Sequence, residues 1–377
     1  MNAATFGAKA RLIGLWRLAA VVVFAASLGG CADIDGATSY VGGLGGAGAP
    51  PPPPKMLQVF IASTRKGESG LSAQTASTDG THFALATLTM PPSHQSGAIE
   101  SPMWGAPNPR SHIVVAGERE MDNDEFQAEL ASHVSGRIGV NRDVLVFVHG
   151  FNTPFDEARD RTAQIVADSR FGGVAVLFTW PTKHELFGYV SDKDNAMASR
   201  DALQALLQEI SATPGVGKVH VLAHSMGGWL AMEALRQEAI AGRRDLGGHL
   251  GQIMLASPDI DLDVFSAQMA RLRPADVTVF ASSKDRALSL SSALAQSRVR
   301  VGAIDPGNAE QRAEIEALGV KVYDLSNYSD GFIGHGAYAV TPAVLASIGA
   351  GLATPRAEDV DKVSRLDESG YTEKPEN

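Results

Sequence analysis

The chain has 377 residues, of which 44% are hydrophobic and 20% charged, and its formal net charge at pH 7 is −10. This composition is typical of a soluble globular protein. An acidic chain without a dense block of Lys and Arg lacks the electrostatic footprint of a nucleic-acid-binding protein, so we expect no nucleic-acid partner. A small-molecule substrate fits this composition better.

The first 30 residues have the pattern of a secretory signal. They contain Lys9, Arg11 and Arg17 but no acidic residue, and they end in the apolar stretch "LAAVVVFAASLGG". A positively charged start, a short apolar run and small residues before a cleavage site are typical of a signal peptide. The run is shorter than the roughly 20 residues that a membrane span requires.

Cys31, the single cysteine of the chain, follows directly. The sequence "LGGC" resembles the lipobox of bacterial lipoproteins, in which the cysteine is lipidated and becomes the mature N-terminus. The resemblance implies that residues 1–30 are a lipoprotein signal peptide. It also implies a lipid anchor on Cys31 in the cell envelope, facing the periplasm, and Ala32 favours the outer membrane. An ordinary signal peptide with an incidental cysteine is the alternative.

Two segments are predicted to lie outside the folded part. Residues 31–56 form a Gly/Pro-rich linker that includes five consecutive prolines at positions 50–54, a composition typical of a stiff spacer. Residues 353–377 are charged and almost free of large apolar side chains, which predicts a disordered tail. The pattern G-x-G-x-x-G at Gly43, Gly45 and Gly48 lacks the preceding strand of a dinucleotide site, so we expect no such cofactor.

Residues 57–352 are predicted to form one folded domain. Three strand-like runs come early in it, at residues 57–63, 83–90 and 112–117. From Asp143 onward, apolar runs rich in β-branched residues alternate with helical stretches, which predicts a parallel sheet buried on both faces. These runs are "VLVFVHG", "VAVLFTW", "KVHVLAH", "GQIMLAS", "VTVFAS" and "VKVYDLS". We therefore expect an α/β fold with a mostly parallel central sheet, helices on both faces and extra N-terminal strands.

Two helices can be placed from local patterns. Four apolar residues at i, i+3, i+4 and i+7 spacing predict one buried helical stripe, and they are Leu203, Leu206, Leu207 and Ile210. Residues 153–156 have the pattern of a helix start, with Thr153 as the N-cap, a first-turn proline and an acid at the third position.

The stretch "VHVLAHSMGGWL", residues 219–230, places Ser225 between a buried strand and a helix. Such a turn lies at the carboxyl end of the sheet, where open α/β folds place their sites. The small residues Ala223 and Gly227 avoid collisions in a tight turn. Because the helix N-terminus directs N–H groups to the same point, the turn also favours negative charge. Ser225 is therefore a candidate nucleophile, with a plain helix cap as the alternative.

These residues resemble the nucleophile elbow G-x-S-x-G of the α/β-hydrolase superfamily, with Ala223 in place of the first glycine. The segments "FVHGFN", "FTWP", "AHSMGG", "ASPDID" and "SSKDRAL" are together similar to a little-characterised bacterial esterase/lipase-like branch of it. The resemblance implies an α/β-hydrolase fold and a serine esterase. The esterase would act on a small-molecule ester through an acyl-enzyme and a Ser-His-Asp triad, with no metal or other cofactor.

A serine nucleophile needs a base to take its proton, and the superfamily order is Ser, acid, His. Two histidines follow Ser225 in the sequence. His249 lies at the start of a strand and hence at the opposite edge of the sheet, whereas His335 lies in a Gly-flanked loop after the last strand. We predict His335 as the base. His149 and His224 are expected to form structural hydrogen bonds.

Two positions can supply the acid. Asp285 follows the penultimate strand, where the superfamily usually carries it, and Asp259 and Asp261 follow the strand before, a position that some relatives use. We predict Asp285 as the acid and expect Asp259 to hold its loop by accepting backbone N–H bonds. The resemblance also implies an oxyanion hole formed by the backbone N–H groups of Phe151 and Met226.

These patterns define the substrate and the type of reaction less closely than they define the candidate triad. An amidase, peptidase, thioesterase or acyltransferase would use the same triad, and a non-catalytic envelope lipoprotein could use the fold for binding. Residues 257–275 leave room for only a short helix as a lid, and the other candidate cover, residues 181–194, is mostly polar. We therefore expect an open site for short acyl esters, unless residues 63–110 fold over it.

Overall fold

The structure is a computed structural model, and it describes residues 52–66, 75–76, 80–183, 188–295, 299–328 and 334–353. The predicted signal peptide, Cys31, most of the predicted linker and residues 354–377 of the predicted tail lie outside these residues. Among the described residues, no helix has both the length and the apolar character needed to cross a membrane.

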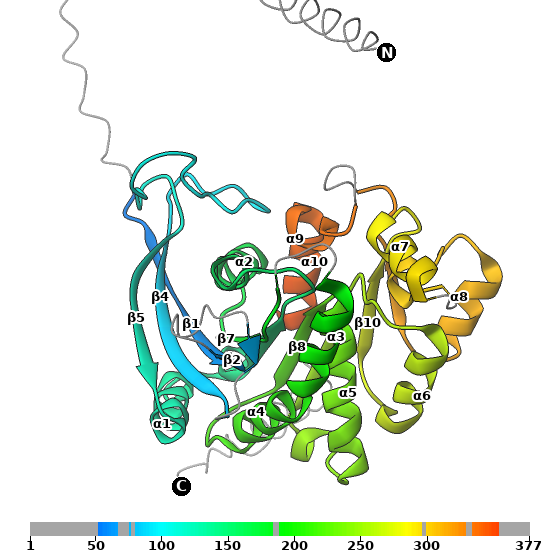
Figure 1. The fold of residues 1–377 in the computed structure, drawn as a ribbon. Helices are drawn as coiled ribbons and strands as arrows, with labels where there is room; N and C mark the ends of the chain where they lie inside the picture. The colour runs from blue at the N-terminus through cyan, green and yellow to red at the C-terminus, as the bar shows by residue number, and fades with distance from the viewer. Residues whose placement is uncertain are drawn as a thin grey trace, which may run out of the picture. The chain divides into compact units, whose positions relative to one another are not determined.

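A nine-stranded sheet forms the centre of the domain (Figure 1). The strands stand in the order β11-β10-β9-β8-β6-β7-β1-β4-β5, and all neighbours from β11 to β1 are parallel. β4 and β5 are antiparallel additions at the β1 edge. The strands are β1 Lys55–Ser63, β4 His82–Met90, β5 Val114–Met121, β6 Val144–Val148, β7 Val174–Thr179, β8 Val219–His224, β9 Leu250–Ala256, β10 Val277–Ala281 and β11 Lys321–Asp324. The prediction of a mostly parallel sheet with extra N-terminal strands is confirmed.

The central strands β6, β7 and β10 are buried along their whole length because both faces of the sheet are covered there. In β6, Val144, Val146 and Val148 belong to one hydrophobic core, and Leu145 and Phe147 belong to the other. All five side chains are buried. Alternate residues of a strand point to opposite faces, so each face needs its own helical layer.

Helices form these two layers. The first core is covered by α1 Asn123–Val134, α4 Arg200–Ala212, α5 Met226–Ile240 and α6 Leu262–Leu272, and the second by α2 Phe155–Ser169, α9 Ala337–Val340 and α10 Pro342–Ala353. The remaining elements are α3 Tyr189–Ala198, α7 Arg286–Ala295, α8 Ala309–Glu316, the short strands β2 Arg65–Lys66 and β3 Thr75–Ala76, and the 3₁₀ turns η2 Gly139–Arg142, η4 Leu246–Gly248 and η5 Val301–Ala303. The prediction of helices on both faces is confirmed.

Of the two predicted helices, one starts differently from its pattern. The four apolar residues of the stripe in α4 are all buried, as predicted. At α2, however, Pro154 is the N-cap and no side chain caps the helix, so the predicted Thr153 cap was wrong. The Thr153 hydroxyl instead donates to the carbonyl oxygens of Gly150 and Phe151, at 3.1 and 3.3 Å. The Thr153 hydroxyl therefore bonds inside the β6–α2 loop instead of capping the helix.

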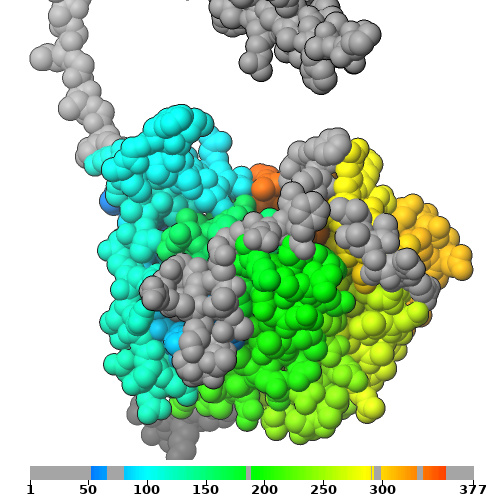
Figure 2. Space-filling view, viewed as in Figure 1, coloured from blue at the N-terminus to red at the C-terminus, as the bar shows by residue number. Residues whose placement is uncertain are grey.

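The loop between β4 and β5, residues 91–113, packs against the second helical layer. In the space-filling view its cyan segment forms the upper left corner of the domain (Figure 2). The Gly97 amide donates to Asp168 Oδ2 at 2.8 Å, and a Cβ at Gly97 would collide with the backbone of Val340 in α9. The loop thus joins α2 to the short helix that follows His335.

His94 fixes this loop between two carboxylates. Its Nδ1 lies 2.9 Å from each carboxylate oxygen of Glu100, and its Nε2 lies 3.0 Å from Asp168 Oδ1. The hydrogen bond to Asp168 raises the pKa of His94, against the opposing effect of partial burial, and Glu100 adds to the increase. The protonated ring, which has two donors, satisfies both carboxylates at once.

Replacing His94 by Gln is expected to cost stability in a pH-dependent manner. Because the folded-state pKa is raised, the contribution of His94 is complete below the unfolded pKa of about 6.5 and is lost as the pH rises through the folded value. The difference in free energy of unfolding between wild type and His94→Gln, measured by urea denaturation, should therefore shrink as the pH increases above about 6.5.

The matched control is His112→Gln in the same loop, where Nδ1 accepts a hydrogen bond from the Asn108 amide. This variant gives the reference for replacing a histidine of this loop by Gln without removing the ion pairs of His94. A stability difference for His94→Gln that stays constant across the titration range would contradict the ion-pair interpretation.

Candidate active site

Ser225 lies on the turn between β8 and α5 with an unusual backbone conformation. Its φ is 54° and its ψ is −123°, and its side chain makes no capping bond to the helix. The backbone is held on both sides, because the amide donates to Ala256 O at 2.9 Å and the carbonyl accepts from the amides of Gly228 and Asp259 at 2.9 and 3.1 Å. The hydroxyl is therefore not used to cap α5.

Small residues permit this turn. A Cβ at Gly227 would collide with the carbonyl oxygen of His149, because the start of α5 packs directly on the end of β6. A Cβ at Gly150 would lie 3.0 Å from the Cβ of Ser225. The predicted need for a small residue at Gly227 is confirmed, and Gly150 of the β6–α2 loop packs closely against the side chains of His224 and Ser225.

Three non-glycine residues with positive φ lie at this edge of the sheet. Asn152, Ser225 and Ser257 have φ values of 56°, 54° and 44°, and they follow β6, β8 and β9, which are neighbours in the sheet. Non-glycine residues at such angles cost about 1–3 kcal/mol each and persist where the surrounding structure enforces them, often at functional sites. The carboxyl ends of the central strands are therefore the candidate site.

Asp285 and His335 meet directly at the same edge. Asp285 follows β10 and is fully buried, and its Oδ2 lies 2.7 Å from Nδ1 of His335. Its other oxygen, Oδ1, accepts from the Leu288 amide at 3.0 Å, which fixes the carboxylate. A carboxylate on Nδ1 keeps a proton there and leaves Nε2 of His335 as the nitrogen that can accept one.

His335 packs on the residue that precedes the serine. The ring centroids of His224 and His335 are 4.7 Å apart, and Nε2 of His224 donates to the His335 carbonyl oxygen at 3.1 Å. Burial, and then the charge of His335, lower the pKa of His224 well below its usual value, so that its ring stays neutral. Among the described residues, the Ser225 hydroxyl makes no hydrogen bond with His335; such bonds often form only when substrate binds.

Asp259, the alternative acid, has different partners. Tyr189 and Ser291 donate their hydroxyls to its two oxygens at 2.7 and 2.8 Å, and Arg300 Nε lies 3.1 Å from Oδ1. The expectation that it accepts backbone N–H bonds was wrong for the described residues. Side chains satisfy it because three chain segments converge on the turn after β9. The structure brings Asp285, and not Asp259, to His335.

Tyr189 lines one side of the site. It belongs to the segment 181–194 that the sequence offered as a cover, and its ring packs edge-on against Phe151 with centroids 5.7 Å apart. Burial raises the pKa of Tyr189 to about 12, and the neighbouring carboxylate of Asp259 adds to this. The hydroxyl therefore stays protonated and donates to Asp259.

The two predicted oxyanion donors lie on the two loops that meet at Ser225. The carbonyl oxygen of Gly150 accepts from His149 Nδ1 at 2.9 Å and from the Thr153 hydroxyl at 3.1 Å. Because the C=O and N–H of one trans peptide point in opposite directions, the Phe151 N–H points away from these donors. Met226 is the first residue of α5, where N–H groups have no partner within the helix.

His249 lies at the other end of the sheet, as predicted. It directly precedes β9, and its Nδ1 donates to the Gly217 carbonyl oxygen at 2.7 Å. It therefore cannot reach Ser225. Within the ranges that the structure describes, no group of three or more His, Cys, Asp or Glu side chains could hold a metal ion.

Sequence reasoning missed Arg65, which is fully buried under the β6–α2 loop. Its Nε donates to Thr179 Oγ1 at 2.8 Å and its Nη2 to the Thr153 carbonyl oxygen at 3.0 Å. Burial lowers the pKa of Arg65 to about 10, and the charge of Asp192 opposes this, so Arg65 is a cation at neutral pH. The available signal was its position two residues after the carboxyl end of the apolar strand β1.

The fold and the site together define a class of protein. A mostly parallel sheet with a strained serine turn, and a histidine–carboxylate pair beside it, is the arrangement of an α/β-hydrolase. Residues 122–353 match the family described as "Alpha/beta hydrolase of unknown function (DUF900)", and the chain belongs to this family. The predicted membership of the α/β-hydrolase superfamily is confirmed.

Individual relatives are distant. The uncharacterized protein alr1448 of Nostoc sp. is 26% identical over 155 residues, which are 34% of this chain and 38% of that protein. The chain therefore matches well under two thirds of that relative's length.

The chain is also similar, at low identity and low TM-score, to solved structures. A Pyrobaculum calidifontis esterase is 12% identical with a TM-score of 0.35, over 80% of this chain and 86% of that one. Naproxen esterase from Bacillus subtilis is 10% identical with a TM-score of 0.33, over 78% and 90%. At these values nothing about activity is inferred from either likeness.

Proposed function

We propose that the protein is a serine hydrolase that cleaves carboxylic esters through an acyl-enzyme. Ser225 is the nucleophile, His335 the base and Asp285 the acid that orients His335. The observation that carries the proposal is the 2.7 Å contact between Asp285 and His335, next to a serine that is held at a φ of 54° and does not cap its helix. A serine used only as a cap needs neither feature.

The reaction follows from these positions. Nε2 of His335 takes the hydroxyl proton while Ser225 Oγ attacks the ester carbonyl. The negative charge that develops on the carbonyl oxygen is stabilised by the N–H groups of Phe151 and Met226, each contributing about 3 kcal/mol in such enzymes. His335 then gives its proton to the departing alcohol. A water molecule then takes the place of the alcohol. His335 accepts its proton while the water oxygen attacks the acyl-enzyme, and His335 returns the proton to Ser225 Oγ as the carboxylic acid leaves.

We propose short acyl esters, from acetyl to butyryl, as the substrates. The segment between β9 and β10 holds only α6, and Phe265 and Met269 of this helix are buried in the first hydrophobic core. A helix that packs on the sheet is not available as a lid. Long acyl chains need a broad apolar cover, since each buried CH₂ contributes about 0.8 kcal/mol.

Ser225→Ala is expected to reduce the hydrolysis of p-nitrophenyl butyrate by about 10⁴-fold or more, because no other group supplies the nucleophile. Circular dichroism should stay unchanged. The matched control is Ser211→Ala, a helix-end serine whose hydroxyl donates to Gln208 O, and it should keep full activity. Undiminished turnover by folded Ser225→Ala would end the proposal.

The same assay tests substrate size and class. A series of p-nitrophenyl esters should give the highest kcat/KM at two to four acyl carbons, and a maximum at about eight carbons or more would contradict the short-acyl proposal. Turnover of amides or thioesters in preference to esters would favour the amidase, thioesterase or acyltransferase alternatives. A folded protein with no Ser225-dependent activity would favour a binding role.

Asp285→Asn is expected to lower kcat by about 10⁴-fold, because an amide at this position no longer holds the Nδ1–H tautomer of His335. Asp259→Asn should mainly lower the melting temperature, since removing one partner of a buried ion pair costs about 3–5 kcal/mol. The reverse pattern, with a crippled Asp259→Asn and a nearly active Asp285→Asn, would show that the acid is wrongly assigned.

We also propose that lipid on Cys31 anchors the protein to the cell envelope, facing the periplasm, with the outer membrane preferred. The sequence "LGGC" supports this. β1 begins at Lys55, which pairs with Met90, so the chain from Cys31 joins the domain where the β4–β5 loop leaves the sheet. This loop exposes Met103 and Trp104, at 85% and 86%, as suits the surface nearest a lipid bilayer.

Radiolabelled palmitate should be incorporated into the wild-type protein and not into Cys31→Ser, and only the wild type should sediment with membranes. Unlabelled wild-type protein in the soluble fraction would contradict the anchor, and it would leave the hydrolase proposal untouched.

A further inference from the structure

Arg65 places a guanidinium group inside the protein at the end of β1. A buried charge is costly unless it is paired and hydrogen-bonded. Arg65 donates to Thr179 Oγ1 and to the Thr153 carbonyl oxygen, its Nη2 lies 3.3 Å from Nε2 of His149, and the Asp192 carboxylate supplies the opposite charge. The N-terminal strand is thereby joined to the end of β7 and to the β6–α2 loop.

Arg65 is one of three groups around Nε2 of His149 that together determine which ring nitrogen carries the proton. Arginine has donors only, so the nitrogen that faces it must accept. The Trp180 backbone N–H also points at Nε2, at 3.2 Å, and the Thr179 hydroxyl lies 3.0 Å from it. With these donors around Nε2, the proton of the neutral ring lies on Nδ1.

This proton position orients the peptide between Gly150 and Phe151. Nδ1 of His149 donates to the Gly150 carbonyl oxygen at 2.9 Å. With the proton on Nε2 instead, a lone pair would face that oxygen, and the two acceptors would repel each other. Since the N–H of Phe151 is antiparallel to this C=O, a rotated peptide would misdirect the N–H as well.

We propose that Arg65, acting through the Nδ1–H tautomer of His149, is a positioning residue for the oxyanion hole. The inference rests on the proposed serine-hydrolase function and names what holds the Phe151 donor in place. Arg65 touches no substrate. It lies outside residues 122–353, which match the family, so the N-terminal strands supply part of the site's geometry.

The tautomer is tested directly by NMR of protein labelled with ¹⁵N-histidine, with the His149 signals assigned by loss in His149→Asn. In the wild type, Nδ1 should resonate as the protonated nitrogen and Nε2 as the unprotonated one. In Arg65→Met, this distinction should be weakened or reversed. Retention of the wild-type pattern in Arg65→Met would overturn the proposal, whether or not the protein hydrolyses esters.

Kinetics separate positioning from general stability. Arg65→Met should lower kcat for p-nitrophenyl butyrate by about 100-fold or more, the effect of losing one oxyanion donor, with KM nearly unchanged. Affinity for a trifluoromethyl ketone, which mimics the tetrahedral intermediate, should fall in parallel. Arg65→Lys, which keeps the charge but cannot reach all three partners at once, should give an intermediate loss and serves if Arg65→Met does not fold.

A double-mutant cycle with His149→Asn tests whether Arg65 acts through His149. The Asn amide can donate to Gly150 O without a tautomer, so Arg65→Met should cost much less in that background than in the wild type. Equal losses in both backgrounds would contradict action through His149.

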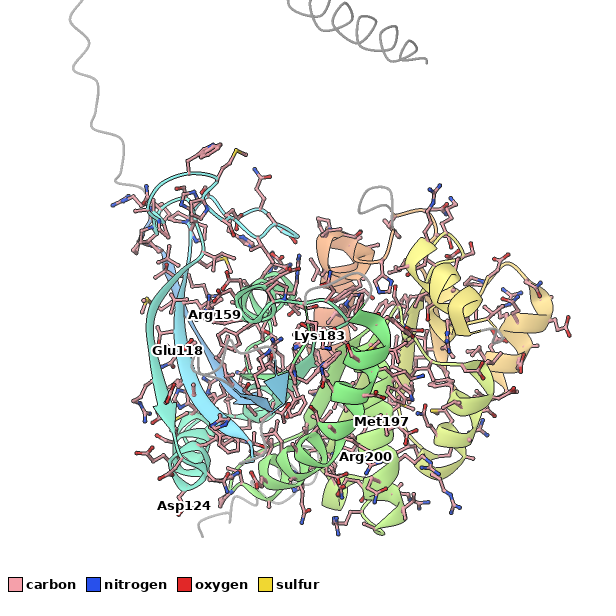
Figure 3. All side chains as sticks on the ribbon, in the orientation of Figure 1. Glu118, Asp124, Arg159, Lys183, Met197 and Arg200 are labelled. Atoms are coloured by element: carbon pink, nitrogen blue, oxygen red, sulfur yellow. The ribbon has the colours of Figure 1, made fainter. Side chains whose placement is uncertain are left out.

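The matched control is Arg159→Met. Arg159 is also largely buried, but it lies in α2, where its Nη1 is 2.9 Å from Asp156 Oδ1 and 3.7 Å from Glu118 Oε2 of β5 (Figure 3). This variant should lose stability and keep its kcat. If the wild type shows no ester turnover and no Ser225-dependent labelling by a fluorophosphonate, the proposed function fails, and the NMR result still decides the role of Arg65.

Discussion

The serine turn between β8 and α5 is the constraint on which the site depends. Holding Ser225 at a φ of 54° is unfavourable by about 1–3 kcal/mol, so the surrounding backbone must enforce it. Neighbouring strands hold this conformation. The carbonyl oxygen of Ala256 in β9 accepts a hydrogen bond from the Ser225 amide, and the backbone at the end of β6 lies so close to Gly227 that a Cβ would not fit there. The parallel sheet, buried on both faces, supplies the rigidity that this geometry requires.

Each charged group near the serine turn lies next to a group of opposite charge or a hydrogen-bond partner. Asp285 contacts His335, Asp259 accepts from Tyr189 and Ser291 beside Arg300, and Arg65 donates to the loop after β6. A buried charge without a partner would be strongly destabilising, so each group comes with its counterpart. The site is thereby organised from the ends of several strands, including that of β1, which precedes the matched family region.

The sequence predicted the sheet well because buried parallel strands are continuously apolar, and all nine predicted runs form strands. Ser225, Asp285 and His335 could be named from strand ends and chain order. The buried hydrogen bonds of Arg65 near them could not be predicted, because Arg65 lies 84, 88 and 114 residues from its partners in the sequence. The Thr153 cap failed for a different reason, since its hydroxyl donates to carbonyl oxygens of its own loop, those of Gly150 and Phe151, and not to the helix.

Mass spectrometry after reaction with a fluorophosphonate tests the central claim most directly, since the reagent forms a stable bond only with an activated serine. The account predicts one adduct per chain, located on the tryptic peptide that contains Ser225, and its loss when His335 is replaced by Ala. A folded wild-type protein that remains unmodified, or an adduct on another serine with Ser225 unchanged, would contradict it.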